Sequence, residues 1–189
     1  MLTGEASRRA DFGDGDHPTR ALACTFHHHV ITMPKTLVLF HGGDADLIAM
    51  AEAVADGVRS VRFAEVDLRQ LADSAAPGGG RHRTLATAEE LAGYDGLVLG
   101  AAAGGADIPG NVTRLLTEAA SLRKQGQLTV SVGAAFARGD ADSEWGLLRA
   151  LGALGVVLVP PGAADAKQLG HRVAHVVSWI THARSHHHH

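Results

Sequence analysis

The 189-residue sequence has little cysteine, few aromatic residues and no excess of positive charge, and each shortage excludes a class of protein. Its one cysteine, Cys24, excludes a disulfide framework and a cysteine-rich metal site. A lone cysteine is typical of a reducing compartment, so we expect the protein in the cytoplasm. Aromatic residues are 4% of the chain and the net charge is −3, which argues against nucleic-acid binding.

Long apolar runs are also missing, which bears on the organisation of the chain. No run of about 18 apolar residues occurs, so the sequence predicts no membrane span. Residues 1–33 have no apolar period and are expected to be a disordered or non-native tail, and residues 184–189 resemble an expression tag. Residues 34–183 remain, enough for one domain with a single core.

What the chain does contain is an alternation of short apolar runs and amphipathic segments. The runs predict strands at 36–40, 61–68, 97–99, 128–132 and 156–159. The amphipathic segments predict helices that begin at Asp44 and Thr87 and that span 109–124, 143–154 and 167–183. This alternation predicts a parallel sheet with helices on both faces.

Ligands of such sheets bind outside the carboxyl ends of the strands, where the strand order reverses. Three segments rich in glycine and alanine leave those ends, at 41–46, 100–108 and 133–142. Gly42 and Gly43 are compatible with a phosphate cradle and with a simple tight turn. Asp44 and Asp46 have the pattern of cation ligands or of helix N-caps, and we favour the caps because they are far commoner.

Other groups of residues give weaker indications of a functional site. The stretch 40–43 is similar to the oxyanion-hole stretch of esterases, but Ser131 lacks the G-x-S-x-G spacing, so we reject hydrolysis. His171 and His175 share a helix face, but no third ligand follows, and we predict no metal site. Arg138 is interpreted as a contact for a nicotinamide cosubstrate or, preferably, as a solvated loop residue.

Trp145 and Trp179 are spaced along the predicted helices as core or interface residues, and we assign them no role toward a cofactor.

Three segments resemble known proteins: 47–57, 87–100 and 151–162. They are similar to the flavodoxin-like family, and more narrowly to the WrbA-type NAD(P)H:quinone oxidoreductases. The resemblance implies a flavodoxin-like three-layer sandwich with a five-stranded parallel sheet in the order 2-1-3-4-5. It further implies FMN as cofactor, NAD(P)H as co-substrate, a quinone or another small electron acceptor, and a homo-dimer or tetramer.

The resemblance also implies which residues hold the cofactor. The backbone N–H groups of 42–46 are expected at the phosphate, 101–105 at the edge of the ring, and 133–136 at the ring or ribityl chain. No catalytic side chain and no metal ligand is predicted. The predicted cofactor-binding residues are His41, Gly42, Gly43, Asp44, Ala45, Asp46, Ala101, Ala102, Ala103, Gly104, Gly105, Gly133, Ala134, Ala135 and Phe136.

A second hypothesis follows from the first of these loops. The segment 41–46 has no serine or threonine, and its two aspartates would repel a phosphate dianion at the start of the helix. The alternative to an oxidoreductase is therefore a flavodoxin-fold protein that has lost FMN and acts as a non-catalytic binding or scaffold module.

Overall fold

A computed structural model describes residues 33–72, 82–85, 87–102, 108–139, 141–162 and 165–185. The strands form one parallel sheet in the order β3-β2-β1-β4-β5-β6. Their bounds are β1 Lys35–His41, β2 Glu65–Leu71, β3 Arg83–Leu85, β4 Gly96–Ala102, β5 Val132–Arg138 and β6 Val157–Val159.

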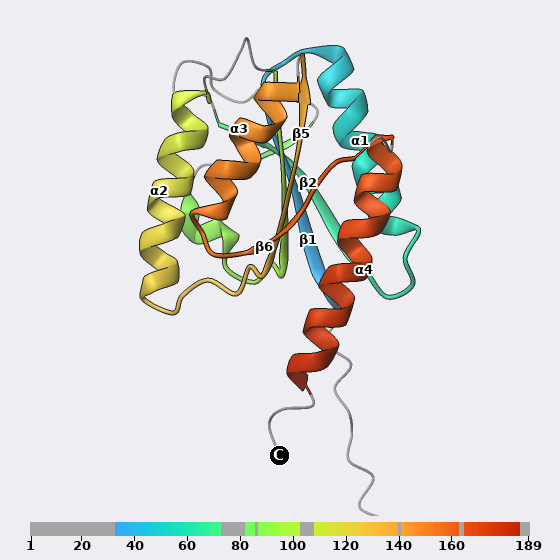
Figure 1. The fold of residues 1–189 in the computed structure, drawn as a ribbon, viewed down its shortest axis with the longest axis vertical. Coiled ribbons are helices and arrows are strands. Elements are labelled where there is room, and N and C mark those ends of the chain that lie inside the picture. Colours follow the sequence, from blue (N-terminus) through green and yellow to red (C-terminus); the bar gives the residue numbers. More distant parts are fainter. Residues whose placement is uncertain are drawn as a thin grey trace, which may run out of the picture. The chain divides into compact units, whose positions relative to one another are not determined.

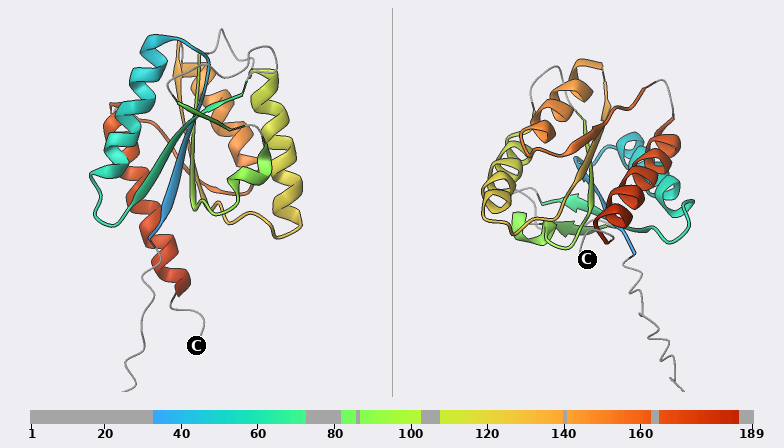
Figure 2. Two further views of the ribbon diagram at one scale, coloured as in Figure 1. Left: turned by 180° about the vertical axis from the view of Figure 1, so that it is seen from behind. Right: turned by 60° about the horizontal axis from the view of Figure 1, so that its bottom comes forward.

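Helices cover both faces of this sheet. One face carries α2 and α3, and the opposite face carries α1 and α4 (Figures 1 and 2). The bounds are α1 Ala45–Arg59, the 3-10 helix η1 Ala88–Leu91, α2 Gly110–Lys124, α3 Ala141–Gly152 and α4 Ala166–Ser185. The predicted three-layer α/β architecture is confirmed, with an additional strand β3 beside β2.

Each of the two sheet faces has its own hydrophobic core, because alternate residues of a strand point to opposite faces. Leu37 and Leu39 of β1 pack on the α2–α3 side, whereas Val38 and Phe40 pack on the α1–α4 side. This two-sided burial is the physical reason that the central strands read as continuous apolar runs.

Two predicted strands are displaced along the chain. The strand predicted at 61–68 begins at Glu65, because 61–64 form a turn in which the amide of Ala64 donates to the carbonyl of Val61. The strand predicted at 128–132 is β5, and only its last residue, Val132, belongs to the strand.

The helices lie close to their predicted positions. Thr87, where a helix was predicted to begin, forms a capping box with Glu90 at η1. The last helix runs past its predicted end at Ala183 and includes Arg184, whose guanidinium donates to the carbonyl of Thr129 at 3.3 Å. None of the helices in the described part of the chain is long and apolar enough to cross a membrane.

Candidate functional site

The candidate site lies at the carboxyl edge of the sheet, around the ends of β1, β4 and β5. The chain moves from β1 to β2 in one direction and from β4 to β5 and β6 in the other, so the strand order reverses between β1 and β4. In open α/β sheets this switch point is where ligands bind. His41 of β1 pairs with Ala101 of β4 there, so the first two predicted segments meet.

The first loop is held in place by its own polar groups and by a neighbouring strand. Gly42 has a φ of +124°, which a residue with a side chain rarely adopts. The side-chain amide of Gln70 in β2 donates to the carbonyl of Gly42 at 3.0 Å. The turn between β1 and α1 is thereby fixed against β2.

Asp44 is the N-cap of α1, as predicted. Its carboxylate oxygen Oδ1 accepts from the amide of Asp46 at 3.0 Å and from the amide of Leu47 at 3.1 Å. These amides belong to the first turn of the helix, where the positive end of the helix dipole attracts anions. The anion that occupies this place is thus the side chain of the protein itself.

Arg138 joins the end of β5 to the start of α1. Its guanidinium pairs with the carboxylate of Asp44 and, through Nη2, with Oδ2 of Asp46 at 3.0 Å. We call Asp44, Asp46 and Arg138 the acidic clasp. Arg138 is exposed, as predicted, but it is the last residue of a strand and is ion-paired, so the part of the prediction that places it in a loop is wrong. Because Asp46 and Arg138 are 92 positions apart in the sequence, no local sequence signal connects them.

His41 contributes an unsatisfied polar atom at the same edge. Its ring nitrogen Nδ1 is buried and has no hydrogen-bond partner within the described ranges. A buried ring nitrogen without a partner is costly unless a ligand or water supplies one. Of the predicted site residues that the structure describes, His41 is the one with a buried side-chain polar atom that lacks a partner.

The third predicted segment does not form a loop. Gly133, Ala134, Ala135 and Phe136 lie inside β5 and are buried. Phe136 is 1% exposed, and its ring packs over Gly100 of the neighbouring strand, where an added Cβ would overlap it. Gly100 is therefore a packing requirement of the sheet, and it is residues 137–139, at the end of β5, that lie at the carboxyl edge.

The remaining predicted residues are placed as follows. Ala101 is buried and Ala102 is exposed at the end of β4, next to the first loop. Ala103, Gly104 and Gly105 lie outside the described residues.

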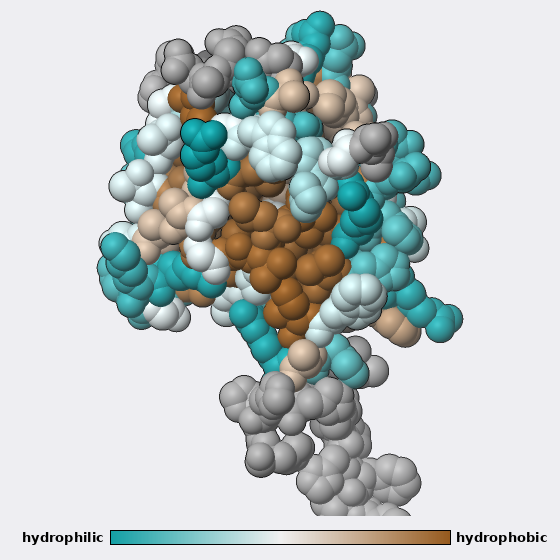
Figure 3. Space-filling view, viewed as in Figure 1, coloured by the Kyte–Doolittle hydropathy of each residue, from teal (hydrophilic) through white to brown (hydrophobic). Residues whose placement is uncertain are grey.

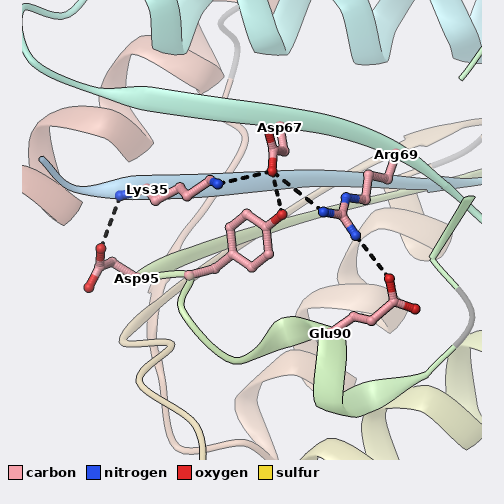
Figure 4. Close-up of polar contacts among 6 residues, drawn as sticks. Lys35, Asp67, Arg69, Glu90 and Asp95 are labelled. Atoms are coloured by element: carbon pink, nitrogen blue, oxygen red, sulfur yellow. Dashed lines mark hydrogen bonds and ion pairs between the residues drawn. The ribbon is translucent and has the colours of Figure 1, made fainter. Parts of the chain in front are cut away.

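A second polar cluster lies on the α2–α3 face, away from the carboxyl edge (Figure 4). The hydroxyl of Tyr94 donates to Asp67 at 2.5 Å, and Lys35 pairs with the same carboxylate at 3.2 Å. Arg69 lies 3.6 Å from Asp67 and 3.0 Å from Glu90. The cluster links β1 and β2 to the segment before β4.

The electrostatics of this cluster are those of a structural network. Burial raises the pKa of Asp67, but hydrogen bonds from Tyr94 and Lys35 and the charges of Lys35 and Arg69 outweigh burial and lower it below its ordinary value. Burial and the contact with Asp67 raise the pKa of Tyr94 to about 12. A phenol with this pKa stays protonated near neutrality, and the cluster lies away from the carboxyl edge, so we assign the cluster no catalytic role.

The histidine pair on α4 is close enough to chelate an ion, with 3.1 Å between the Nε2 atoms of His171 and His175. Nevertheless, among the described residues no group of three or more metal-ligating side chains occurs.

The chain is similar in sequence to known proteins. No protein-family model matches the chain. The chain is 31% identical over 112 residues to an NAD(P)H dehydrogenase (quinone) of Acidithiobacillus ferrooxidans. It is 33% identical over 112 residues to the protein of that name from Rhodopseudomonas palustris and 34% identical over 111 residues to that of Acidovorax ebreus. Each match covers 55% of this chain and 56% of the relative, so the chain spans little more than half of the length of these relatives.

Solved structures show the fold. An archaeal flavodoxin superposes with a TM-score of 0.54 at 18% identity and covers 76% of this chain and 98% of its own. A flavodoxin, WrbA-like protein from Agrobacterium tumefaciens gives 0.52 at 16% identity and covers 77% and 98%. The chain therefore has the flavodoxin fold, as the sequence predicts.

Proposed function

We propose that the chain is a quinone oxidoreductase-like protein with NAD(P)H as co-substrate and FMN as cofactor. The observation that carries this proposal is the 31–34% identity to three relatives named NAD(P)H dehydrogenase (quinone). The flavodoxin fold supports it, because the switch point between β1 and β4 is the place where such folds bind their ligands.

The chain's own groups define what it contributes to this function. A bound flavin would supply the hydride chemistry, and the protein would supply binding and orientation. The exposed end of β4 at Ala102 would lie along the ring, and His41 Nδ1 would accept or donate one hydrogen bond to the ligand. No side chain at this edge is assigned to proton transfer.

The phosphate group of FMN does not fit the start of α1 as the acidic clasp stands. The amides of Asp46 and Leu47 are already taken by Asp44, and the clasp carries two carboxylates against one guanidinium. A phosphate dianion would meet like charge there, which costs on the order of 4 kcal/mol per contact at about 4 Å before screening by salt.

This misfit favours a second candidate function. A flavodoxin-fold protein whose phosphate site is filled by its own carboxylate would act as a non-catalytic binding or scaffold module. The filled phosphate site argues against the first candidate and for the second, so an experiment that measures FMN binding distinguishes the two.

The decisive experiment compares FMN with riboflavin, which has the same ring without phosphate. Purified protein is incubated with either compound, desalted, and examined for flavin absorbance and for a shift of Tm. The oxidoreductase proposal expects retained FMN in a one-to-one ratio and bleaching of its absorbance by NAD(P)H. A colourless protein whose Tm does not change with excess FMN contradicts the oxidoreductase proposal and supports the second candidate. Retention of riboflavin but not of FMN shows that the phosphate group is what prevents binding.

A further inference from the structure

Two exposed histidines, His171 and His175, lie one turn apart on α4. Along this helix Figure 3 shows mostly hydrophilic side chains, beside an apolar surface that lies over β6. The Nε2 atoms of the two rings are 3.1 Å apart. Two nitrogens that bind one ion at 2.0–2.1 Å lie about 2.8–3.4 Å apart when the angle at the ion is about 90–109°. The spacing of the pair is therefore that of a two-ligand metal chelate.

The hydroxyl of Ser60, the C-cap of α1, fixes the tautomer of His171. Ser60 Oγ donates its one proton to the carbonyl of Gly57 at 2.6 Å. It lies 2.9 Å from Nδ1 of His171 and, because its proton is already used, it accepts a hydrogen bond there. His171 therefore carries its proton on Nδ1 and presents an unprotonated Nε2 to His175. Metal-bound histidines are held in this way, because their second ring nitrogen donates to a neighbouring group.

Close packing of α1 on α4 keeps Ser60 beside His171. A Cβ on Gly57 would lie 2.8 Å from the backbone nitrogen of His171, so the last turn of α1 rests directly on this turn of α4. The ring of His175 is followed along α4 by that of Trp179, with 6.2 Å between the centroids. The position of one ligand is thus set by two helices rather than by its own helix alone.

We propose that His171 and His175 bind a divalent transition-metal ion through their Nε2 atoms, with Ser60 as the positioning residue for His171. Without an ion, Nε2 of His175 donates to the unprotonated Nε2 of His171. On binding, His175 changes tautomer by proton exchange with water, so that its proton lies on Nδ1 and both Nε2 lone pairs face the ion. Imidazole nitrogens suit Zn²⁺, Ni²⁺ and above all Cu²⁺, and water fills the other positions.

The contact with Ser60 is what the structure adds to the sequence. The sequence alone predicts no metal site at this pair, because no third ligand follows it, and α4 has no acidic residue that could supply one. Lys167, one turn before His171, adds a like charge, so the affinity depends on the two nitrogens alone. The proposal does not depend on whether the carboxyl edge binds FMN.

The test measures the Tm of the full chain during titration with Zn²⁺ near neutral pH. Residues 27–29 and 186–189 are also histidines. Consecutive histidines bind an ion without needing a fold, so they bind the folded and the unfolded chain alike and shift Tm little. The pair on α4 has its spacing only in the folded helix. Saturating Zn²⁺ is therefore expected to raise the Tm of the wild type by about 5 °C or more.

His171→Asn and His175→Asn each leave one ligand, and each is expected to weaken Zn²⁺ binding at least about tenfold and to remove most of the shift. Ser60→Ala keeps both ligands but removes the acceptor for Nδ1 of His171, and is expected to weaken binding about tenfold. Ser60→Thr restores the hydroxyl and is expected to restore the affinity. All three positions are exposed, and circular dichroism verifies that each variant is folded.

His182→Asn is the matched control, because it removes a histidine from the same helix but not from the pair. It is expected to leave the Zn²⁺-induced shift of Tm unchanged. A shift that is equal in the wild type and in both pair variants means that only the terminal histidines bind the ion, and it overturns the proposal. Absence of a shift in the wild type also overturns it.

Quenching of Trp179 fluorescence by Cu²⁺ gives a second, local measurement. Trp145→Phe leaves Trp179 as the one tryptophan of the chain, next to the ring of His175. Cu²⁺ is expected to quench this protein, and adding His175→Asn is expected to raise the Cu²⁺ concentration for half-quenching at least about tenfold. Equal quenching with and without His175 contradicts the proposed site.

Discussion

Asp44 holds the backbone donors of α1 that a bound phosphate group would otherwise use. Asp44→Ser keeps an N-cap oxygen and removes one negative charge, so it changes the free energy of unfolding by less than about 1 kcal/mol. We expect it to raise the affinity for FMN about tenfold or more, because one like-charge contact disappears. Titration of flavin fluorescence measures this affinity.

Asp56→Ser is the control for this residue. It removes the same charge from the other end of α1, where Asp56 pairs with Arg59 at 2.7 Å on the surface. A long-range charge effect would raise FMN affinity equally in both variants. Equal affinities of Asp44→Ser, Asp56→Ser and the wild type would show that the acidic clasp does not govern phosphate binding.

At the scale of elements, glycines allow α1 and α4 to approach each other closely. A Cβ on Gly170 of α4 would overlap the carbonyl of Val54, and a Cβ on Gly57 of α1 would overlap the carbonyl of Lys167. Because the obstacle is backbone, no side-chain rotation relieves it. Gly170→Ala is therefore expected to destabilise the protein by about 2–3 kcal/mol, measured by urea denaturation.

Gly110→Ala tests whether this loss reflects packing. Gly110 begins α2, and a Cβ there meets no atom within 4 Å. Alanine at this position is expected to be neutral or to stabilise by up to about 1 kcal/mol, because alanine has the higher helix propensity. If Gly170→Ala is no less stable than Gly110→Ala, the two helices are not as close as described.

Some of the strands and helices could be predicted from the sequence, and others could not. β1 was predictable because five consecutive buried residues leave a continuous apolar run, and α1 because Asp44 caps it. β5 was not, because its residues Gly133, Ala134 and Ala135 look like a loop when seen alone. The absence of a side chain at Gly133 is dictated by Val156 just before β6, which a Cβ there would meet at 2.8 Å. This neighbour is remote in sequence, so the segment itself does not indicate it.

The candidate site was predictable to a smaller extent. The alternation of strands and helices locates the carboxyl edge, because topology fixes where the switch point lies. The pairing of Arg138 with Asp44 and Asp46 depends on β5 ending two strands away from β1, and on a side chain long enough to cross β4. Such a contact has no periodicity and no spacing rule, so it emerges only once the strands are placed.

At the scale of the whole molecule, the Tyr94–Asp67 contact makes stability depend on pH at both extremes. The pKa of Asp67 is lowered in the folded state, so its contribution is present above the unfolded value and is lost as pH falls in the acid range. The pKa of Tyr94 is raised to about 12, so its contribution is present below about 10 and is lost as pH rises through 12. Tm is expected to fall on both limbs.

Tyr94 is the one tyrosine of the chain, so near-ultraviolet absorbance of tyrosinate reports this residue alone. In the folded protein, checked by circular dichroism in the same samples, we expect ionisation near 12, and in denaturant near 10. Asp67→Asn is expected to lower the pKa of Tyr94 in the folded protein while leaving it above 10, because burial is the largest cause of the raised pKa. Tyr94→Phe removes the alkaline loss of stability and costs about 1.5–3 kcal/mol at neutral pH through the lost hydrogen bond to a carboxylate. Ionisation near 10 in the folded wild type would mean that Tyr94, in the segment before β4, is not buried against Asp67 of β2.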